Sequence, residues 1–281
     1  MRKFNLFAIS FLLLSLLFIP VLGGCSTQAS SKLKVVTGSS LLTYIVQQVG
    51  GDKVEVTNLI PPAQHPGDFN IKPGDIQTLS GANLFILHGW PGEKYADKFV
   101  ASANNPNLAV VKAGIDGNWM IPSLQMAAVE KVASILIQAD SNNTSFYQNL
   151  AKGYKARISS KESEIKSRLA KSNISQISVI ASIRQADFLK WAGFKIAGTY
   201  DSPDSLTPQT VKELVDKGKS ARVSLIINNL QDSADAGKGI AEELGIKSIN
   251  LSNFPGGYED TGTWEKAIDK NVDLLLESLQ K

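Results

Sequence analysis

The chain has 281 residues, 43% of them hydrophobic, and a formal net charge of +3. That length is enough for one large domain or two of ordinary size. Subtracting Arg2 and Lys3 of the N-terminal segment from +3 leaves +1, so charge gives no reason to expect nucleic acid as a partner.

The N-terminal segment has the organisation of a bacterial secretory signal. Two positive residues precede an apolar run over residues 6–22, and Gly23 and Gly24 come directly before Cys25, the single cysteine. A positive start, an apolar stretch and a small-residue cleavage site mark a segment that is removed. A cysteine directly after the small residues resembles a lipobox, in which cleavage leaves Cys25 first and its thiol carries a lipid.

We therefore expect residues 1–24 to be a lipoprotein signal peptide and residues 25–32 to be a lipidated polar tether. The protein would then be extracytoplasmic, held to the cell membrane by acyl chains in a periplasm or at the cell surface. A membrane-spanning anchor is the alternative, which proline and glycine at the end of the apolar run disfavour. With Cys25 acylated, no thiol remains for disulfides, thiolate metal sites or nucleophilic catalysis.

Strand-like and helix-like segments alternate through residues 33–140. Short β-rich runs are separated by stretches whose apolar residues repeat at helical spacing, and Ser39 or Ser40 can cap the first helix. Such alternation predicts a parallel sheet covered by helices. The expected strands are residues 33–37, 54–59, 83–87 and 108–112, and the expected helices lie near residues 41–49, 73–80, 93–103 and 123–138.

Residues 144–171 predict one long helix. No proline interrupts them, and most of their other residues are polar or charged around a single apolar stripe. At a rise of about 1.5 Å per residue the helix spans about 42 Å, more than a compact domain of this size needs internally. We expect it to join two lobes; a coiled-coil partner helix is the alternative. The stripe consists of Phe146, Leu150, Tyr154, Ile158, Ile165 and Leu169.

The alternation restarts after this helix. The expected strands are residues 177–181, 194–198, 223–228 and 246–251. One expected helix begins at Thr207-Pro208, and two more cover residues 234–244 and 263–279. The predicted fold is α/β with two lobes, each a mostly parallel sheet covered by helices, joined by one long rigid helix. The predicted boundaries are 33–140 for the N-terminal lobe, 141–173 for the linking helix and 174–281 for the C-terminal lobe.

Several stretches of the chain resemble one known family. The sequences VVTGSS and VGGDKVEVTNLIPP, then PGDIQTLSGANLFILHG, and later TPQTVKELVD and IAEELGIK are similar to solute-binding lipoproteins of zinc and manganese ABC importers. The resemblance covers essentially the whole chain after the signal. It implies two α/β lobes joined by a rigid helix that limits closure. It also implies a metal held between the lobes by about four histidine and carboxylate side chains, and an importer permease as partner.

The resemblance also locates the family's metal ligands, and this chain departs from the family there. His65 stands where the family has an aspartate, two residues before the family's first histidine. Neutral hydroxyls and amides are poor ligands for a transition-metal dication, so these positions suit an organic ligand or an already chelated metal better than a bare ion. The positions aligned with the family's ligands hold Gly67, Asn118, Ser182, Asn229 and Ser252.

His65 and His88 are the two histidines and the candidate metal ligands. His65 lies in a proline-rich turn after one expected strand, and His88 directly follows another, so both are expected at the edge of the cleft in the first lobe. Zinc or manganese would be the transported ligand rather than a resident cofactor. The alternative is one capping histidine and one surface histidine.

Other candidate ligand-binding residues lie in loops after strands, where a cleft between α/β lobes would receive them. Aromatic side chains there can stack on a ring or cover an apolar face of a ligand. An arginine can bind an anionic or amide group, although it serves equally as an exposed charge at a helix start. The candidate set is Trp90, Asn118, Ser182, Arg184, Asn229, Ser252 and Tyr258.

No enzyme motif is present: there is no G-x-S-x-G, H-E-x-x-H or Walker-type loop. We therefore expect a monomeric, non-enzymatic, lipid-anchored solute-binding protein. It would capture a divalent metal ion or a metal complex between its lobes and deliver it to an ABC-importer permease. Two alternatives stay open: a receptor for a small polar organic ligand on the same fold, and an adhesin or interaction protein that binds no ligand.

Overall fold

The computed structural model describes residues 32–64 and 66–280. The signal peptide, most of the predicted tether, Cys25 and His65 lie outside the described residues. Within those residues, none of the helices has the length and apolar character needed to cross a membrane.

The first sheet has four parallel strands in the order β2-β1-β3-β4. Its strands are β1 (Leu33–Thr37), β2 (Val54–Asn58), β3 (Leu84–Leu87) and β4 (Ala109–Lys112). The helices around it are α1 (Ser40–Gly50), α2 (Pro73–Ser80), α3 (Tyr95–Ala103) and α4 (Pro122–Ala139). The predicted strands and helices of this lobe are confirmed, with bounds that shift by one or two residues.

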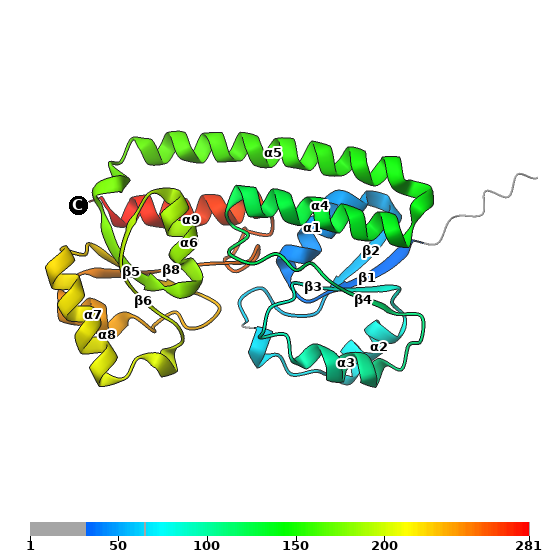
Figure 1. The fold of residues 1–281 in the computed structure, drawn as a ribbon, viewed down its shortest axis with the longest axis horizontal. Helices are drawn as coiled ribbons and strands as arrows, with labels where there is room; N and C mark the ends of the chain where they lie inside the picture. The colour runs from blue at the N-terminus through cyan, green and yellow to red at the C-terminus, as the bar shows by residue number, and fades with distance from the viewer. Residues whose placement is uncertain (1–31, 65, 281) are drawn as a thin grey trace, which may run out of the picture. The chain divides into compact units, whose positions relative to one another are not determined.

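Alternating residues of the strands send apolar side chains to opposite faces of this sheet. Val35 and Ile86 join a core with α1 and α4, whereas Val36 and Phe85 join a second core with α2 and α3. The sheet is therefore buried on both faces, as expected for parallel strands. Figure 1 shows the two helix layers on either side of the strands.

The second sheet repeats the arrangement with the order β6-β5-β7-β8, again all parallel. Its strands are β5 (Ser178–Ser182), β6 (Lys195–Tyr200), β7 (Leu225–Asn229) and β8 (Lys247–Leu251), and its helices are α6 (Ile183–Ala192), α7 (Pro208–Ala221), α8 (Lys238–Leu244) and α9 (Trp264–Ser278). Helix α6 was not predicted, because it begins directly where β5 ends. Ser182 is both the last residue of β5 and the cap of α6.

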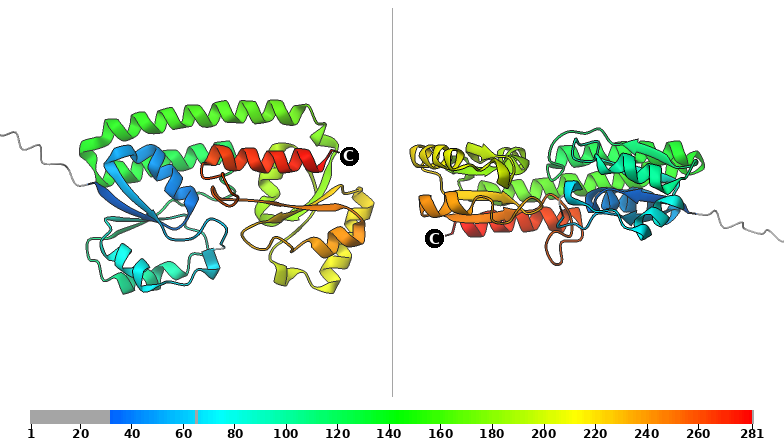
Figure 2. Two further views of the ribbon diagram at one scale, coloured as in Figure 1. Left: turned by 180° about the vertical axis from the view of Figure 1, so that it is seen from behind. Right: turned by 90° about the horizontal axis from the view of Figure 1, so that it is seen from below.

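The long helix is α5 (Thr144–Ala170), which confirms the predicted element. It packs on α1 and α4 of the first lobe and on α9 of the second. Figures 1 and 2 show α5 running alongside the two lobes. Its buried stripe begins at Tyr147, not at the predicted Phe146 and Leu150, which stay partly exposed. From Tyr154 onward the predicted stripe is correct.

A single hydrophobic core extends from one lobe to the other. It includes Leu42 of α1, Val129 of α4, Ile158 of α5, Phe188 of α6 and Ile268 of α9. The two sheets are therefore attached to a shared layer of helices and do not have separate cores on this side.

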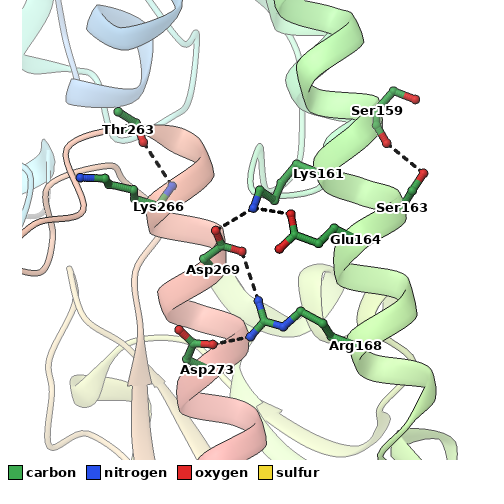
Figure 3. Close-up of polar contacts among 9 residues, drawn as sticks. All are labelled: Ser159, Lys161, Ser163, Glu164, Arg168, Thr263, Lys266, Asp269 and Asp273. Atoms are coloured by element: carbon green, nitrogen blue, oxygen red, sulfur yellow. Dashed lines mark hydrogen bonds and ion pairs between the residues drawn. The ribbon is translucent and has the colours of Figure 1, made fainter.

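Ion pairs reinforce the contact between α5 and α9 (Figure 3). Lys161 Nζ lies 2.8 Å from Asp269 Oδ2 and 2.7 Å from Glu164 Oε2. Arg168 lies 3.2 Å from Asp269 Oδ1 and also pairs with Asp273. Each carboxylate oxygen of Asp269 thus pairs with a different cation of α5, and Asp269 links two turns of α5 to α9.

Substituting Asp269 by asparagine is expected to lower the free energy of unfolding by about 1 kcal/mol, because two partly exposed ion pairs are lost together. Denaturant unfolding at low and high salt measures the effect, which salt should reduce by screening. Asp216→Asn, which removes one exposed pair with Lys212 on α7, is the matched control. Equal effects for both variants would contradict a network role for Asp269.

Candidate functional site

A cleft lies where the carboxyl ends of the strands of both sheets meet. Its volume is about 430 Å³. The loops after β2, β3, β4, β6, β7 and β8 contribute to it, as does the start of α6 directly after β5. This is the position at which open α/β sheets bind ligands. The described residues that line it are Leu41, Pro66, Trp90, Pro91, Gly92, Glu93, Gly117, Asn118, Trp119, Ile183, Arg184, Asp187, Asp201, Asn229, Gln231, Asp232, Asn253 and Phe254.

His88 lies behind the wall of the cleft and is not among the described lining residues. It is only 1% exposed, its Nε2 lies 2.7 Å from Ser39 Oγ, and its ring stacks on Trp90 with centroids 3.6 Å apart. Burial lowers the pKa of His88 to about 3, so the ring is neutral. To bind a metal it would have to release Ser39, or the ion would have to reach Nδ1 inside the aromatic cluster that Trp119 completes.

Glu93 holds the loop that carries Trp90. Its carboxylate accepts hydrogen bonds from the backbone N–H groups of His88 (2.9 Å), Gly89 (2.6 Å) and Trp90 (3.1 Å). Burial raises the pKa of Glu93, while these three donors act in the opposite direction. Gly89 has φ +92°, a conformation that favours glycine, at the turn that brings the three N–H groups together. The carboxylate of Glu93 is therefore already engaged in holding this loop.

Asn118 joins the two lobes. Its Nδ2 donates to the carbonyl oxygen of Arg184 and to Asn253 Oδ1, both at 2.9 Å, and its Oδ1 accepts from Met120 N at 2.8 Å. The position that the family resemblance aligns with a metal-binding histidine is therefore occupied here by an amide whose donors and acceptor are all engaged.

Further hydrogen bonds cross between the lobes, and three of them end on a backbone carbonyl. Ser40 Oγ donates to Pro255 O at 2.7 Å, and Gln231 Nε2 donates to Pro62 O at 2.9 Å. The indole Nε1 of Trp264 donates to Trp119 O at 3.0 Å. Together with Asn118, these bonds fix the position of the cleft walls.

The other neutral candidates lie at the ends of the second sheet. Ser182 Oγ accepts from Arg184 N at 3.3 Å and caps α6. Asn229 lines the cleft, and its Oδ1 accepts from Gln185 Nε2 at 2.9 Å. Ser252 Oγ is buried, accepts from Gln231 Nε2 and donates to Phe254 O, both at 2.9 Å. Of these, only Asn229 is among the described lining residues.

Arg184 lines the cleft between two carboxylates. Its guanidinium lies 3.3 Å from Asp201 Oδ1 and 3.6 Å from Asp232 Oδ2, and its side chain is 46% exposed. Trp90 also lines the cleft. Tyr258 is not among the described lining residues: its hydroxyl donates to Asn250 O at 2.7 Å beside β8.

Gln231 and Asn253 were not predicted from the sequence. Together with Gln185, which follows Arg184 on α6 and could bind an amide group, they connect the neutral candidates to one another. Gln185 Nε2 donates to Asn253 Oδ1 at 2.8 Å, and Asn253 N donates to Gln231 Oε1 at 3.0 Å. Gln231 and Asn253 each lie two residues after the end of a parallel strand. That position is the one signal by which the sequence indicated them.

The described residues contain no group of three or more histidine, cysteine, aspartate and glutamate side chains placed to hold a metal ion. Pro66 lines the cleft, while its neighbour His65 lies outside the described residues. The side chains that line the described part of the cleft include both amides and carboxylates. The carboxylates are held by backbone N–H groups in the case of Glu93, by Arg184 in the case of Asp201 and Asp232, and by Lys190 in the case of Asp187.

Comparisons with a family model and with curated relatives identify the same family. The model of a family described as zinc-uptake complex component A, periplasmic (ZnuA), matches residues 35–278. The metal ABC transporter substrate-binding lipoprotein SsaB of Streptococcus sanguinis is 24% identical over 310 residues, covering 97% of this chain and 99% of the relative. The iron-binding protein YfeA of Yersinia pestis is 24% identical over 270 residues, covering 89% and 87%.

Solved structures show the same fold. A cadmium-bound periplasmic metal-binding protein from Candidatus Liberibacter asiaticus has a TM-score of 0.77 at 18% identity, covering 89% of this chain and 100% of that one. The substrate-binding protein FpvC of P. aeruginosa, in complex with Ni²⁺, has a TM-score of 0.75 at 21% identity, covering 89% and 97%. At these identities the structures support the fold alone.

Proposed function

The chain belongs to the ZnuA family of periplasmic metal-uptake components, and from that premise we propose that it is the extracytoplasmic substrate-binding lipoprotein of a metal-type ABC importer. It takes its cargo into the cleft between the lobes and delivers it to a membrane permease. Catalysis has no part in this function. The observation that carries the proposal is the 430 Å³ cleft at the carboxyl ends of both sheets.

The N-terminal sequence supports the cellular location. Cys25 follows a signal-like segment and two glycines, and an acyl chain on its thiol would hold the cleft at the membrane surface, within reach of a permease. Relatives such as SsaB of Streptococcus sanguinis are named as substrate-binding lipoproteins.

We propose further that the cargo is a metal carried within a complex rather than a bare ion. Zinc and manganese sites in proteins use imidazole nitrogen, thiolate or carboxylate, and the described cleft residues form no such cluster. A volume of about 430 Å³ lies in the range of pockets that hold organic ligands. A chelator that supplies most of the metal's ligands would need only shape, charge and a few hydrogen bonds from the protein.

Native mass spectrometry with elemental analysis tests the cargo. The protein, produced as residues 26–281, contains the compact unit Lys32–Lys281 and is purified without added chelator. We expect a stoichiometric metal together with an organic mass. A stoichiometric bare metal would contradict the complex but keep the importer role, and an organic mass without metal would favour the organic-ligand receptor. A clean apo mass, with no thermal stabilisation by metals or complexes, would favour the ligand-free adhesin.

The same measurement applies to His65, which we propose contacts the cargo because its neighbour Pro66 lines the cleft. His65→Ala is expected to lower cargo retention at least tenfold, the loss of one good ligand or hydrogen bond of about 1.4 kcal/mol. His65→Gln, which keeps a hydrogen-bonding side chain, is the control that separates ligation from hydrogen bonding. Unchanged retention in both variants would remove His65 from the site.

A further inference from the structure

Two asparagine side chains line the cleft at the carboxyl ends of neighbouring strands. Asn229 is the last residue of β7, and Asn253 lies two residues after the end of β8. The two strands are adjacent in the second sheet. Asn229 is only 3% exposed and Asn253 is half-buried, so the surrounding structure decides how each amide is oriented.

A backbone carbonyl fixes the orientation of Gln185, which holds both asparagines. Gln185 Nε2 lies 3.1 Å from Leu251 O, and a carbonyl oxygen can only accept a hydrogen bond. The atom of Gln185 at this position must therefore be the nitrogen. It also donates to Asn229 Oδ1 at 2.9 Å and to Asn253 Oδ1 at 2.8 Å, so the atoms of both asparagines that face Gln185 are oxygens.

A second carbonyl gives the same orientation for Asn253. Asn118 Nδ2 donates to the carbonyl oxygen of Arg184, and Asn118 Oδ1 accepts from Met120 N, so the amide of Asn118 cannot be turned round. Asn118 Nδ2 also donates to Asn253 Oδ1 at 2.9 Å. Two separate chains of hydrogen bonds, each anchored on a backbone carbonyl, thus identify the same atom of Asn253 as its oxygen.

The amide nitrogens of the two asparagines are left for a ligand. Within residues 32–64 and 66–280, Nδ2 of Asn229 and Nδ2 of Asn253 have no hydrogen-bond partner. Neither is among the fully enclosed side-chain atoms that lack a partner, so the cleft gives access to both. The nitrogens of the other lining amides, Asn118 and Gln231, already donate. The adjacent ends of β7 and β8 therefore offer unused donors.

The carboxylates that line the cleft do not occupy these donors. They are held by backbone N–H groups, by Lys190 or by Arg184. In the described part of the chain, none of them bonds to Asn229 or Asn253. A ligand thus competes with no carboxylate for the two NH2 groups. The lining carboxylates are those of Glu93, Asp187, Asp201 and Asp232.

We propose that the cleft holds its cargo by oxygen acceptors of the cargo, which receive hydrogen bonds from Asn229 Nδ2 and Asn253 Nδ2. The proposal rests on the proposed function, since it names the chemical class of the cargo's contact surface. The carbonyl, carboxylate or hydroxamate oxygens of a chelator have this chemistry, and so do the oxygens of a metal-free organic ligand.

Bare and hydrated metal ions suit these donors less well. An amide NH2 group donates hydrogen bonds and is not a metal ligand. Water bound to a metal directs its hydrogens outward, so a hydrated ion would set donors against donors. A chelator reverses this arrangement, because it encloses the metal and presents oxygens to the protein.

Substitution-inert metal complexes test the proposal by isothermal titration calorimetry on residues 26–281, because they do not exchange their ligands with the protein. Tris(glycinato)cobalt(III) is neutral and exposes carbonyl oxygens beside its amines, whereas hexaamminecobalt(III) exposes only N–H groups. We expect the glycinato complex to bind about tenfold more tightly, a difference of about one hydrogen bond. The reverse order, or no binding of the glycinato complex, would overturn the proposal.

Two further probes identify the source of the oxygens. Tris(oxalato)chromate(III) is an anion that exposes carbonyl oxygens, and its binding would extend the cargo class from neutral to carboxylate chelates. Free oxalate is the metal-free probe. Binding of free oxalate as tight as that of its complex would support the donors of the cleft and identify an organic ligand as their source of acceptors.

Asparagine-to-aspartate substitutions give a test whose sign is decisive. In Asn253→Asp, one carboxylate oxygen can still accept from Asn118 and Gln185, while the other replaces the free NH2 group by an acceptor. Tris(glycinato)cobalt(III) should then bind about tenfold more weakly, and hexaamminecobalt(III) more tightly. Asn229→Asp makes the same exchange at the end of β7, and Asn253→Asp stays informative if the more buried variant does not fold. Asn149→Asp, which adds the same charge on the exposed side of α5, is the matched control.

The outcomes separate this proposal from the proposed function. Unchanged affinity for tris(glycinato)cobalt(III) in both aspartate variants, with thermal melting showing that they are folded, would overturn the role of the two asparagines. The importer role would stand if native mass spectrometry still found a cargo retained through purification. If neither a cargo nor a probe were bound, the proposed function would fail as well.

Discussion

Replacing Trp264 by alanine is expected to lower the free energy of unfolding by about 4 kcal/mol, the typical cost of removing a buried indole. The side chain is fully buried at the start of α9, in the core that both lobes share. Its Nε1 also donates across the lobes to the carbonyl oxygen of Trp119. The substitution therefore opens a cavity and leaves a buried acceptor without its partner. Denaturant unfolding followed by circular dichroism measures the loss.

Two variants separate these contributions. Trp264→Phe keeps most of the apolar volume and loses the hydrogen bond, so its cost should be about 1–2 kcal/mol. Trp191→Ala removes a half-buried indole on α6 whose Nε1 lies 3.4 Å from Glu162, and it should cost less than Trp264→Ala. Calorimetry of the unsubstituted protein should show one transition, because the lobes share a core. Two separated transitions would contradict this account of Trp264.

Acidification from pH 8 to pH 5 is expected to lower the stability of the protein by about 2 kcal/mol through His88 alone. Burial lowers the pKa of His88 to about 3 in the folded protein, against an ordinary value of 6.5. Between these values the unfolded chain binds a proton that the folded chain does not, so stability is full above pH 6.5 and falls as the pH decreases toward 3. The carboxylate of Glu93, in the same loop, accepts a hydrogen bond from the backbone N–H of His88.

Substitution by phenylalanine tests this assignment. His88→Phe keeps a ring to stack on Trp90 and removes the titrating group, so the dependence of stability on pH between 8 and 5 should largely disappear, whatever the constant cost of the change. Ser39 Oγ retains its bond from Leu42 N. His65→Gln removes the other histidine and should leave the dependence in place. A His88→Phe variant with the original pH dependence would show that another group is responsible.

The fold was largely predictable because its elements depend on local patterns. Alternating strands and helices, the capping residue Ser39 and the apolar stripe of the long helix are all visible in short windows of sequence. Two local details were missed. Ser182 ends a strand and caps α6 with no intervening loop. Tyr147 and Ala151, not Phe146 and Leu150, continue the buried stripe of α5 toward its first turn, four and three residues apart as a helix face requires.

The site was predictable only in part. Trp90, Asn118, Arg184 and Asn229 do line the cleft, as their positions after strands indicated. His88 also follows a strand, but alternation along β3 places it on the side of Ile86, toward α1, where Ser39 meets it. Which side chain turns inward and which partner it finds depend on contacts between residues far apart in the sequence, and no local pattern contains them.

The hydrogen bonds that cross the cleft have a consequence for how this chain can change. Asn118 and Gln231 donate to the backbone oxygens of Arg184 and Pro62. A backbone acceptor survives replacement of its own side chain, except where the new residue alters the local conformation. Arg184 can therefore be exchanged to suit a different cargo while its carbonyl continues to hold Asn118. The side chain of Arg184 lines the cleft, whereas its backbone carbonyl holds the two lobes together through Asn118. Substitutions at this position can therefore change ligand selectivity without loss of the contact between the lobes.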